Sequence, residues 1–246
     1  MLIKRLNRIN KIASKYFTDQ LKVDRRAYDY ISSRLSKQTI NKFHLGYSKG
    51  DGSLIDLLNE YDISAEEAEV VGLIKTNEQG LSHEVFVDRI MFPIVHAKCV
   101  VGFGGRVLGI SDNYKYINSK SSVLYRKRDV LYGLWYSRRY IYTGGFALLV
   151  EGYMDFLGLY EYDMKNCVAT CGTELTKQQA DAIKRWTDKV YVVSDGDLAG
   201  KKMSKKARGI LAECGIEARP VKLPNNSDPY DYVTECGKTK FLKLIE

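Results

Sequence analysis

Two stretches of this chain share one order of residue types: an apolar run, one or two acidic residues with a glycine, and then a segment compatible with a helix. The first reads Phe-Ala-Leu-Leu-Val-Glu-Gly-Tyr-Met-Asp over 146–155, and the second reads Lys-Val-Tyr-Val-Val-Ser-Asp-Gly-Asp-Leu-Ala-Gly over 189–200. Short apolar runs that lead directly into helices are typical of buried strands in a parallel sheet. The repeated pattern therefore predicts an α/β sheet in which both strands end at the same edge.

The acidic residues at these strand ends form the candidate catalytic site. Ligands of open α/β sheets bind beside the carboxyl ends of the strands, where Glu151, Asp195 and Asp197 are expected to lie. Three carboxylates at one edge repel each other unless a cation lies between them, and Mg2+ is the usual cation when phosphates are the substrate. We therefore expect a catalytic Mg2+ site, with Mn2+ able to substitute, although each motif taken alone is also common in surface turns. Asp228 begins a third acidic cluster after the last predicted strand, near the same edge.

Strands and helices alternate from Phe146 to the carboxyl end, which predicts right-handed crossovers in a parallel sheet. Strands are expected up to Val150 and over 167–170, 190–194 and 216–223, and helices over 154–160, 176–186, 199–214 and 231–245. The first 60 residues are expected to be helical and residues 85–120 to be β-rich. Ser36, Ser64 and Thr176 are expected N-caps. The fold class is α/β, or α+β over the whole chain, with subdomains at 1–145 and 146–246.

Positive charge is concentrated in the first subdomain. Residues 1–145 contain 23 Lys and Arg against 15 Asp and Glu, which accounts for the whole net charge of +8. Between Cys99 and Gly145 eight basic residues stand against two acids. Basic surface next to an acidic metal site indicates a polyanionic partner that one part holds and the other processes. The alternative is that the excess charge only aids solubility.

Two segments of the basic region are candidate nucleic-acid contacts. The run from Cys99 to Gly109 is rich in glycine and contains Arg106, so its backbone is expected to approach a phosphate or base closely. Lys115-Tyr-Ile-Asn118 interleaves aromatics with a cation and an amide, which suits single-stranded nucleic acid, although a two-sided strand fits nearly as well. The strand that begins at Arg89 contains Pro93, so it should be an edge strand or carry a bulge.

Other features of the sequence exclude several classes. No apolar run approaches the roughly 20 residues of a membrane span, and the amino-terminal segment lacks the apolar region of a secretory signal. The five cysteines form no Cys-x-x-Cys pair, and the three histidines are not near them in sequence. We therefore predict no zinc site, no disulfides, a reducing compartment and a cytoplasmic location.

The chain as a whole resembles the RNA-polymerase core of DnaG-type primases, the class found in bacteria and bacteriophages. Glu151-Gly-Tyr-Met-Asp155 and Asp195-Gly-Asp197-Leu-Ala-Gly200 are similar to the two motifs of the TOPRIM module, which topoisomerases also carry. The first half carries the motifs that resemble primases in particular, in the same order as in that family: 45–47, 89–94, 102–108, 115–119 and 131–134. The resemblance extends from about Ala13 to the carboxyl end.

The resemblance implies DNA-templated synthesis of short RNA primers from nucleoside triphosphates on single-stranded DNA during replication. It implies that Asp195, Asp197 and Asp228 bind metal and that Glu151 is the catalytic carboxylate, touching metal or acting in proton transfer. Asp155 is expected to cap or orient the site. Arg106, Lys115 and Asn118, and less directly Arg89 and Lys127, are expected to hold the template or the incoming triphosphate.

Two departures from the family pattern limit these expectations. The third acidic cluster usually reads Asp-Pro-Asp, whereas here Tyr230 stands in place of the second acid and Asp231 follows it. The zinc-ribbon and helicase-interaction domains of longer relatives are not recognisable, so we expect an excised core or a compact primase, with weak template affinity and a replicative helicase reached through another domain or protein. The alternatives are a nuclease or topoisomerase-related protein with a TOPRIM module, and a catalytically inactive nucleic-acid-binding module.

Overall fold

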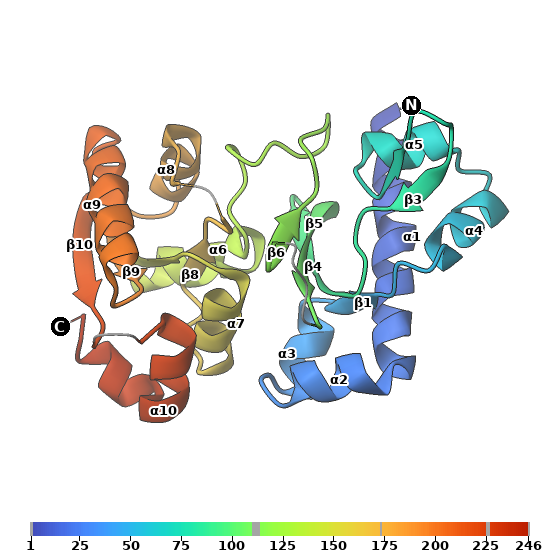
Figure 1. The fold of residues 1–246 in the computed structure, drawn as a ribbon. Coiled ribbons are helices and arrows are strands. Elements are labelled where there is room, and N and C mark those ends of the chain that lie inside the picture. The colour runs from blue at the N-terminus through green and yellow to red at the C-terminus, as the bar shows by residue number, and fades with distance from the viewer. Residues whose placement is uncertain (1, 110–113, 173, 225–226, 246) are drawn as a thin grey trace. The chain divides into compact units, whose positions relative to one another are not determined.

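The computed structural model describes residues 2–109, 114–172, 174–224 and 227–245. The chain divides into two compact units, Met1–Arg126 and Lys127–Glu246 (Figure 1). Within the described ranges, no helix is long and apolar enough to cross a membrane.

The described part of the first unit combines five helices with short strands. Its described elements are α1 (Leu2–Val23), α2 (Arg25–Ser32), α3 (Lys37–Lys42), β1 (Gly46–Ser48), α4 (Ser53–Glu60), α5 (Ala65–Val70), β2 (Ile74–Thr76), β3 (Ser82–Glu84), β4 (Arg89–His96), β5 (Cys99–Val107) and β6 (Tyr116–Asn118). Strands β1, β4, β5 and β6 form an antiparallel sheet in that order, and β2 pairs with β3. This is the mixed α+β subdomain that the sequence predicts.

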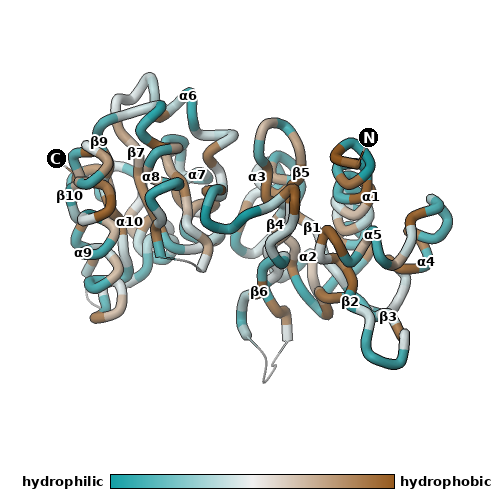
Figure 2. Tube along the Cα trace, turned by 90° about the horizontal axis from the view of Figure 1, so that it is seen from above, coloured by the Kyte–Doolittle hydropathy of each residue, from teal (hydrophilic) through white to brown (hydrophobic). Residues whose placement is uncertain are grey.

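Helix α1 supplies much of the hydrophobic core of this unit. Leu6, Ile9 and Phe17 are buried on one face of the helix, and hydrophilic residues alternate with them along its length (Figure 2). The Phe17 ring meets Phe103 of β5 edge to face, with 5.3 Å between centroids. An apolar stripe at helical spacing buries itself in this way against a sheet.

Pro93 fits into β4 because of local pairing. Strand β4 lies inside the sheet, but β1 pairs only with residues 89–91, so Pro93 has a partner strand on the β5 side alone. A register shift follows between Ile94 and Val95. The unmatched residue at this shift is Val101 of β5, so β4 itself does not carry the bulge; Pro93 instead lies where β4 is paired on one side only, as expected for an edge strand.

Packing explains two of the glycines of β5. A Cβ on Gly105 would lie 2.6 Å from the Phe86 ring, and one on Gly102 would lie 3.1 Å from the Tyr125 ring. Gly104 and Gly105 also pair with β4 and β6. Aromatic side chains thus occupy the space beside these two glycines, and the close approach of this run to a phosphate or base stays a prediction.

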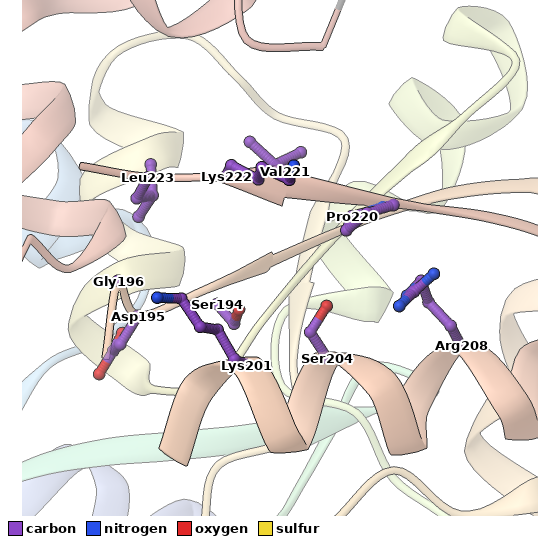
Figure 3. Close-up of a pocket in the computed structure, with 10 residues that line it drawn as sticks. All are labelled: Ser194, Asp195, Gly196, Lys201, Ser204, Arg208, Pro220, Val221, Lys222 and Leu223. Carbon is purple, nitrogen blue, oxygen red and sulfur yellow. The ribbon is translucent and has the colours of Figure 1, made fainter. Parts of the chain in front are cut away.

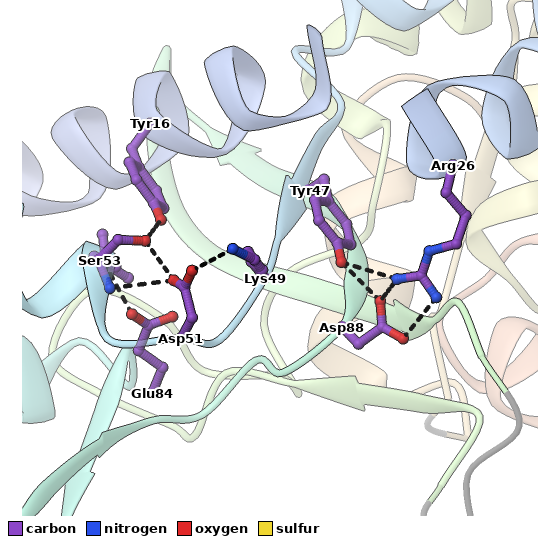
Figure 4. A network of polar contacts seen from close by, with 9 residues as sticks. Tyr16, Arg26, Tyr47, Lys49, Asp51, Ser53, Glu84 and Asp88 are labelled. Carbon is purple, nitrogen blue, oxygen red and sulfur yellow. Dashed lines mark hydrogen bonds and ion pairs between the residues drawn. The ribbon is translucent and has the colours of Figure 1, made fainter. Parts of the chain in front are cut away.

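Two polar networks fix loops of the first unit (Figure 4). In one, Asp88 binds Arg26 and accepts a hydrogen bond of 2.8 Å from the hydroxyl of Tyr47. In the other, Glu84 is buried and accepts from Leu54 N at 2.9 Å, at the start of α4, where Gly52 offers no side-chain cap. A carboxylate from a distant strand thereby satisfies a helix terminus that its own sequence leaves uncapped.

The second unit is the predicted parallel sheet with flanking helices. Its described elements are α6 (Leu134–Gly144), β7 (Ala147–Val150), α7 (Tyr153–Glu161), β8 (Cys167–Ala169), α8 (Lys177–Lys184), β9 (Lys189–Ser194), α9 (Leu198–Glu213), β10 (Glu217–Lys222) and α10 (Pro229–Leu242), with non-helical backbone at Gly237. The strand order is β10-β9-β7-β8, all parallel. Every residue of β7 and β8 is buried, as their continuous apolar runs predict.

Residues 127–145 belong to the second unit, so the boundary differs from the one expected at 145/146. The backbone of Tyr132 exchanges two hydrogen bonds with Ala169 of β8. The side chain of Gln179, on α8, donates to the carbonyls of Lys127 and Val130 at 3.0 and 2.9 Å. These long-range contacts attach the segment to the parallel sheet, and composition along the chain does not reveal them.

Candidate active site

The strand register brings the first acids together. Strands β7 and β9 are adjacent and parallel, with Leu149 opposite Val192, so Glu151 and Asp195 leave the sheet at the same edge. The backbone N–H of Asp195 donates to the Glu151 carboxylate. The sequence prediction that these two residues meet at the carboxyl ends of neighbouring strands is confirmed.

Glu151 is held in an environment that disfavours its charge. Partial burial is the main reason that its pKa is raised, and repulsion by Asp195 and Asp197 adds to the effect. Its Oε1 is buried and has no hydrogen-bond partner among the described residues. A buried carboxylate oxygen without a hydrogen-bond partner costs free energy of folding, so this atom is suited to bind a ligand.

Asp197 and Asp228 begin helices at this edge. Asp197 Oδ1 accepts from Gly200 N at 2.7 Å and caps α9, and Asp228 Oδ1 accepts from Asp231 N at 2.7 Å and caps α10. Gly196 N donates to Ser227 O at 3.0 Å, which ties the two preceding loops together. Each cap leaves the second carboxylate oxygen as a further acceptor next to a helix N-terminus, where negative charge is stabilised.

Asp155 is a buried cap that responds to the neighbouring acids. Its Oδ2 accepts from Gly152 N at 2.8 Å at the start of α7. Burial raises its pKa to about 7, with repulsion by Asp228, Asp195 and Glu151 contributing. The cap expected of Asp155 is observed, and these repulsions connect it electrostatically to the other acids.

This raised pKa predicts a pH-dependent stability. The ordinary pKa of the side chain is 3.8, so the unfolded chain ionises first as pH rises, and stability falls until the folded state also ionises near pH 7. In EDTA, we expect the unfolding free energy to drop by up to about 4 kcal/mol between pH 4 and pH 8. Asp155→Asn keeps an acceptor for Gly152 N and should remove most of this drop in urea titrations. Equal pH slopes in variant and wild type would contradict the assignment.

The acids suit a divalent cation by their chemistry. Carboxylates are ligands that Mg2+ takes beside phosphates, and Glu151 offers a buried oxygen without a partner. In the part of the chain that the structure describes, no three His, Cys, Asp or Glu side chains lie close enough to hold an ion as they stand. An ion bound at Glu151, Asp195 and Asp197 would offset the repulsion between these carboxylates.

Tyr230 explains the departure in the third acidic cluster. A Cβ on Gly158 would lie 2.6 Å from the Tyr230 ring, so this ring packs against α7 where that helix has no side chain. Asp231 is exposed, one residue later on α10. The aromatic residue thus serves the contact between the two helices.

The predicted nucleic-acid residues of the first unit lie on β5, β6 and the segment before β6. Arg106 lies over the rings of Tyr30 and Tyr116 and donates to the Tyr116 hydroxyl at 3.1 Å. Asn118 pairs with Gly104, and Lys115 is exposed. The structure therefore brings Arg106, Lys115 and Asn118 to one hairpin.

Two weaker candidates have structural contacts. Arg89 is 4% exposed, and its Nη1 donates to the carbonyls of Gly105 and Tyr114 at 3.2 and 3.1 Å. Lys127 is half-buried and belongs to the second unit, where its carbonyl accepts from Gln179. Arg89 is thus committed to holding the β5–β6 region together.

A pocket of about 360 Å³ opens beside Asp195, between α9 and β10 (Figure 3). Its polar lining consists of Ser194, Asp195, Lys201, Ser204, Arg208 and Lys222. This pocket is not among the sites predicted from the sequence. The signal was the spacing of Lys201, Ser204 and Arg208, three and four residues apart, which places them on one helix face.

Comparison with known proteins then identifies the family. Residues 16–138 match the family described as DNA primase catalytic core, N-terminal domain. The chain belongs to the DNA primase catalytic core family. Residues 148–233 match the Toprim-like family, which covers the acidic edge of this primase core. Membership of these families implies use of a divalent metal ion.

Relatives of this primase core come from diverse bacteria. It is 37% identical to the DNA primase of Aquifex aeolicus over 232 residues, which covers 94% of this chain and 46% of that protein. It is 35% identical to the DNA primase of Clostridium acetobutylicum over 245 residues, covering 98% and 41%. The chain therefore spans less than half the length of these curated relatives.

Solved structures show the same fold. The Aquifex aeolicus primase structure, with zinc-binding and RNA polymerase domains, aligns with a TM-score of 0.95 at 34% identity, over all of this chain and 61% of that one. The structure of a DnaG primase catalytic domain bound to single-stranded DNA aligns with a TM-score of 0.89 at 30% identity, over 99% and 81%. The predicted fold class is confirmed.

Proposed function

We propose that this chain is the catalytic core of a DNA primase, which synthesises short RNA primers from nucleoside triphosphates on single-stranded DNA. The observation that carries the proposal is the meeting of Glu151 and Asp195 at one sheet edge in a chain of the primase core family. A primase relative is described as bound to single-stranded DNA, which supports the same template here. We also propose a bacterial or phage-infected cytoplasm as the location, since the curated relatives compared above are bacterial.

The proposed reaction is nucleotidyl transfer. A 3′-hydroxyl oxygen attacks the α-phosphorus of a triphosphate, the bond to the β-phosphate oxygen breaks, and the hydroxyl proton and pyrophosphate leave. Glu151 Oε1, buried and without a partner in the described chain, is suited to bind metal or to accept that proton. Asp195, Asp197 and Asp228 would hold Mg2+ or Mn2+ together with Glu151. The bound ion would neutralise charge that develops on the phosphate oxygens.

We propose that the β5–β6 hairpin contacts the template, the primer–template hybrid or the incoming triphosphate through Arg106, Lys115 and Asn118. The exposed Lys115 ammonium is the simplest phosphate contact, and the Tyr116 ring offers a stacking surface next to Arg106. Arg89 would act indirectly, since its guanidinium holds the backbone at Gly105 and Tyr114. Lys127 remains a proposed contact of the second unit.

Because Lys115 is proposed to contact phosphate and Arg89 to act indirectly, variants at these two residues should differ in salt dependence. Lys115→Gln should reduce the slope of log affinity for single-stranded DNA against log salt by about 0.7, because one phosphate contact is lost. Arg89→Met should leave the slope unchanged and should lower the unfolding free energy by roughly 2 kcal/mol, because buried carbonyls lose a charged donor. Fluorescence anisotropy with labelled oligonucleotides and urea titration measure the two effects. If Arg89→Met reduced the salt slope and Lys115→Gln did not, Arg89 rather than Lys115 would contact the phosphate.

The test of the proposed function is direct. The protein is incubated with single-stranded DNA, four ribonucleotides and Mg2+ or Mn2+, and labelled products are sized on a gel. Short RNA products that require both template and metal are expected. Cleavage of DNA without added nucleotides would instead favour a nuclease, and binding without any incorporation would favour an inactive binding module. Adding a replicative helicase tests that proposed partner separately.

A further inference from the structure

The pocket between α9 and β10 carries an excess of positive charge. Lys201, Arg208 and Lys222 line it, against the single carboxylate of Asp195. Figure 3 shows Lys201, Ser204 and Arg208 rising from one face of α9 towards β10. All of these residues belong to the second unit, so the pocket is built within one compact body.

Two polar groups of this pocket are buried without partners. Ser204 is 5% exposed, and its Oγ has no hydrogen-bond partner among the described residues. The same holds for Arg208 Nε, which is also buried. Buried hydroxyl and guanidinium donors are almost always satisfied, so two of them in one pocket indicate that a ligand with acceptor oxygens completes the site.

The chemistry of the lining selects the class of ligand. Guanidinium and ammonium groups with a hydroxyl form charge-assisted hydrogen bonds to phosphate oxygens. A volume of about 360 Å³ lies at the lower end of ligand-pocket sizes, which suits a small anion better than a polynucleotide. We propose that this pocket binds inorganic pyrophosphate, through Lys201, Ser204 and Arg208.

This inference rests on the proposed function for its choice of anion. Nucleotidyl transfer releases pyrophosphate at the acidic edge, and Asp195 belongs both to that edge and to the pocket lining. Pyrophosphate held by α9 would leave the carboxylates accessible for the next triphosphate. The Asp195 carboxylate repels the anion in the absence of metal, so binding should tighten when Mg2+ is present.

The experiment is isothermal titration of pyrophosphate into the whole protein, in EDTA and again in Mg2+, with no template or ribonucleotides. Saturable one-site binding is expected in both. Arg208→Gln and Lys201→Gln should each weaken it at least about tenfold, because each removes a charge-assisted hydrogen bond. Lys205→Gln is the matched control: Lys205 is exposed on the same helix and does not line the pocket, so its affinity change should stay below about twofold.

Titrations with other phosphate compounds show which of them the pocket prefers. Inorganic phosphate and ATP should bind more weakly than pyrophosphate, and one fixed concentration of pyrophosphate should raise the melting temperature of wild type more than that of Arg208→Gln. Tighter binding of ATP with the same dependence on Arg208 would overturn the choice of pyrophosphate. No saturable binding, or equal losses in the Lys205 and Arg208 variants, would overturn the pocket itself. Because no primer synthesis is required, failure here is distinguishable from failure of the proposed function.

Discussion

Glu151→Gln is expected to lower the rate of primer synthesis at least about 100-fold, because one carboxylate of the metal site is lost and metal charge stabilisation contributes several kcal/mol. Glutamine keeps the size of the side chain and an oxygen that can accept from Asp195 N. It also removes a half-buried charge next to Asp195, so the variant should be at least as stable as wild type. Loss of activity with retained stability separates a catalytic role from a structural one.

The matched control is Glu213→Gln, which makes the same change at an exposed position at the end of α9. Its rate should stay within about twofold of wild type, since an isolated surface charge contributes little. Both variants are compared by single-turnover incorporation of labelled nucleotide in excess Mg2+. If Glu151→Gln keeps a third or more of the wild-type rate, Glu151 does not belong to the site.

The second large effect is expected at Gly200, in the first turn of α9. A Cβ at this position would lie 2.3 Å from the backbone oxygen of Asp195 and 2.9 Å from its nitrogen. Backbone atoms cannot yield as a flexible side chain does, so Gly200→Ala should cost about 1–3 kcal/mol of stability and displace Asp195. A displacement near 1 Å costs on the order of 100-fold in rate, so primer synthesis should fall by about that factor even where the protein remains folded.

Gly209→Ala, on the same helix, is the control. A Cβ at Gly209 meets no atom within 4 Å, so alanine there should raise the unfolding free energy by roughly 0.5–1 kcal/mol and leave the rate unchanged. Urea titration and primer synthesis are measured on both variants. A folded, fully active Gly200→Ala protein would show that the close approach of α9 to Asp195 is not required.

The parallel sheet of the second unit could be predicted because its signals are local. A continuous apolar run, a turn glycine or a helix cap such as Thr176 is formed by residues that are neighbours in the chain, and the structure has the expected elements there. The boundary at Arg126/Lys127 could not be predicted, because it depends on contacts such as Gln179 with Lys127 that join distant residues. Pattern along the sequence does not report such pairings.

The candidate site also contains residues whose position the sequence predicted and residues whose role only the structure shows. Glu151 and Asp195 follow strands of one sheet, so their meeting follows from topology alone. Arg89 donates hydrogen bonds to backbone carbonyls because it is buried. The sequence alone does not distinguish a buried arginine from one on the surface. Likewise, the sequence shows only that Tyr230 stands where an acid is expected, whereas the structure shows that its ring packs against Gly158.

The most direct measurement is anomalous diffraction from crystals of the protein soaked in Mn2+. We predict manganese density in contact with the carboxylates of Glu151 and Asp195, with Asp197 rotated towards the ion, and loss of that density in Asp195→Asn crystals. Manganese that binds only elsewhere, or that leaves the Glu151 and Asp195 oxygens untouched while the same preparation makes primers, would contradict a catalytic metal site at this edge of the sheet.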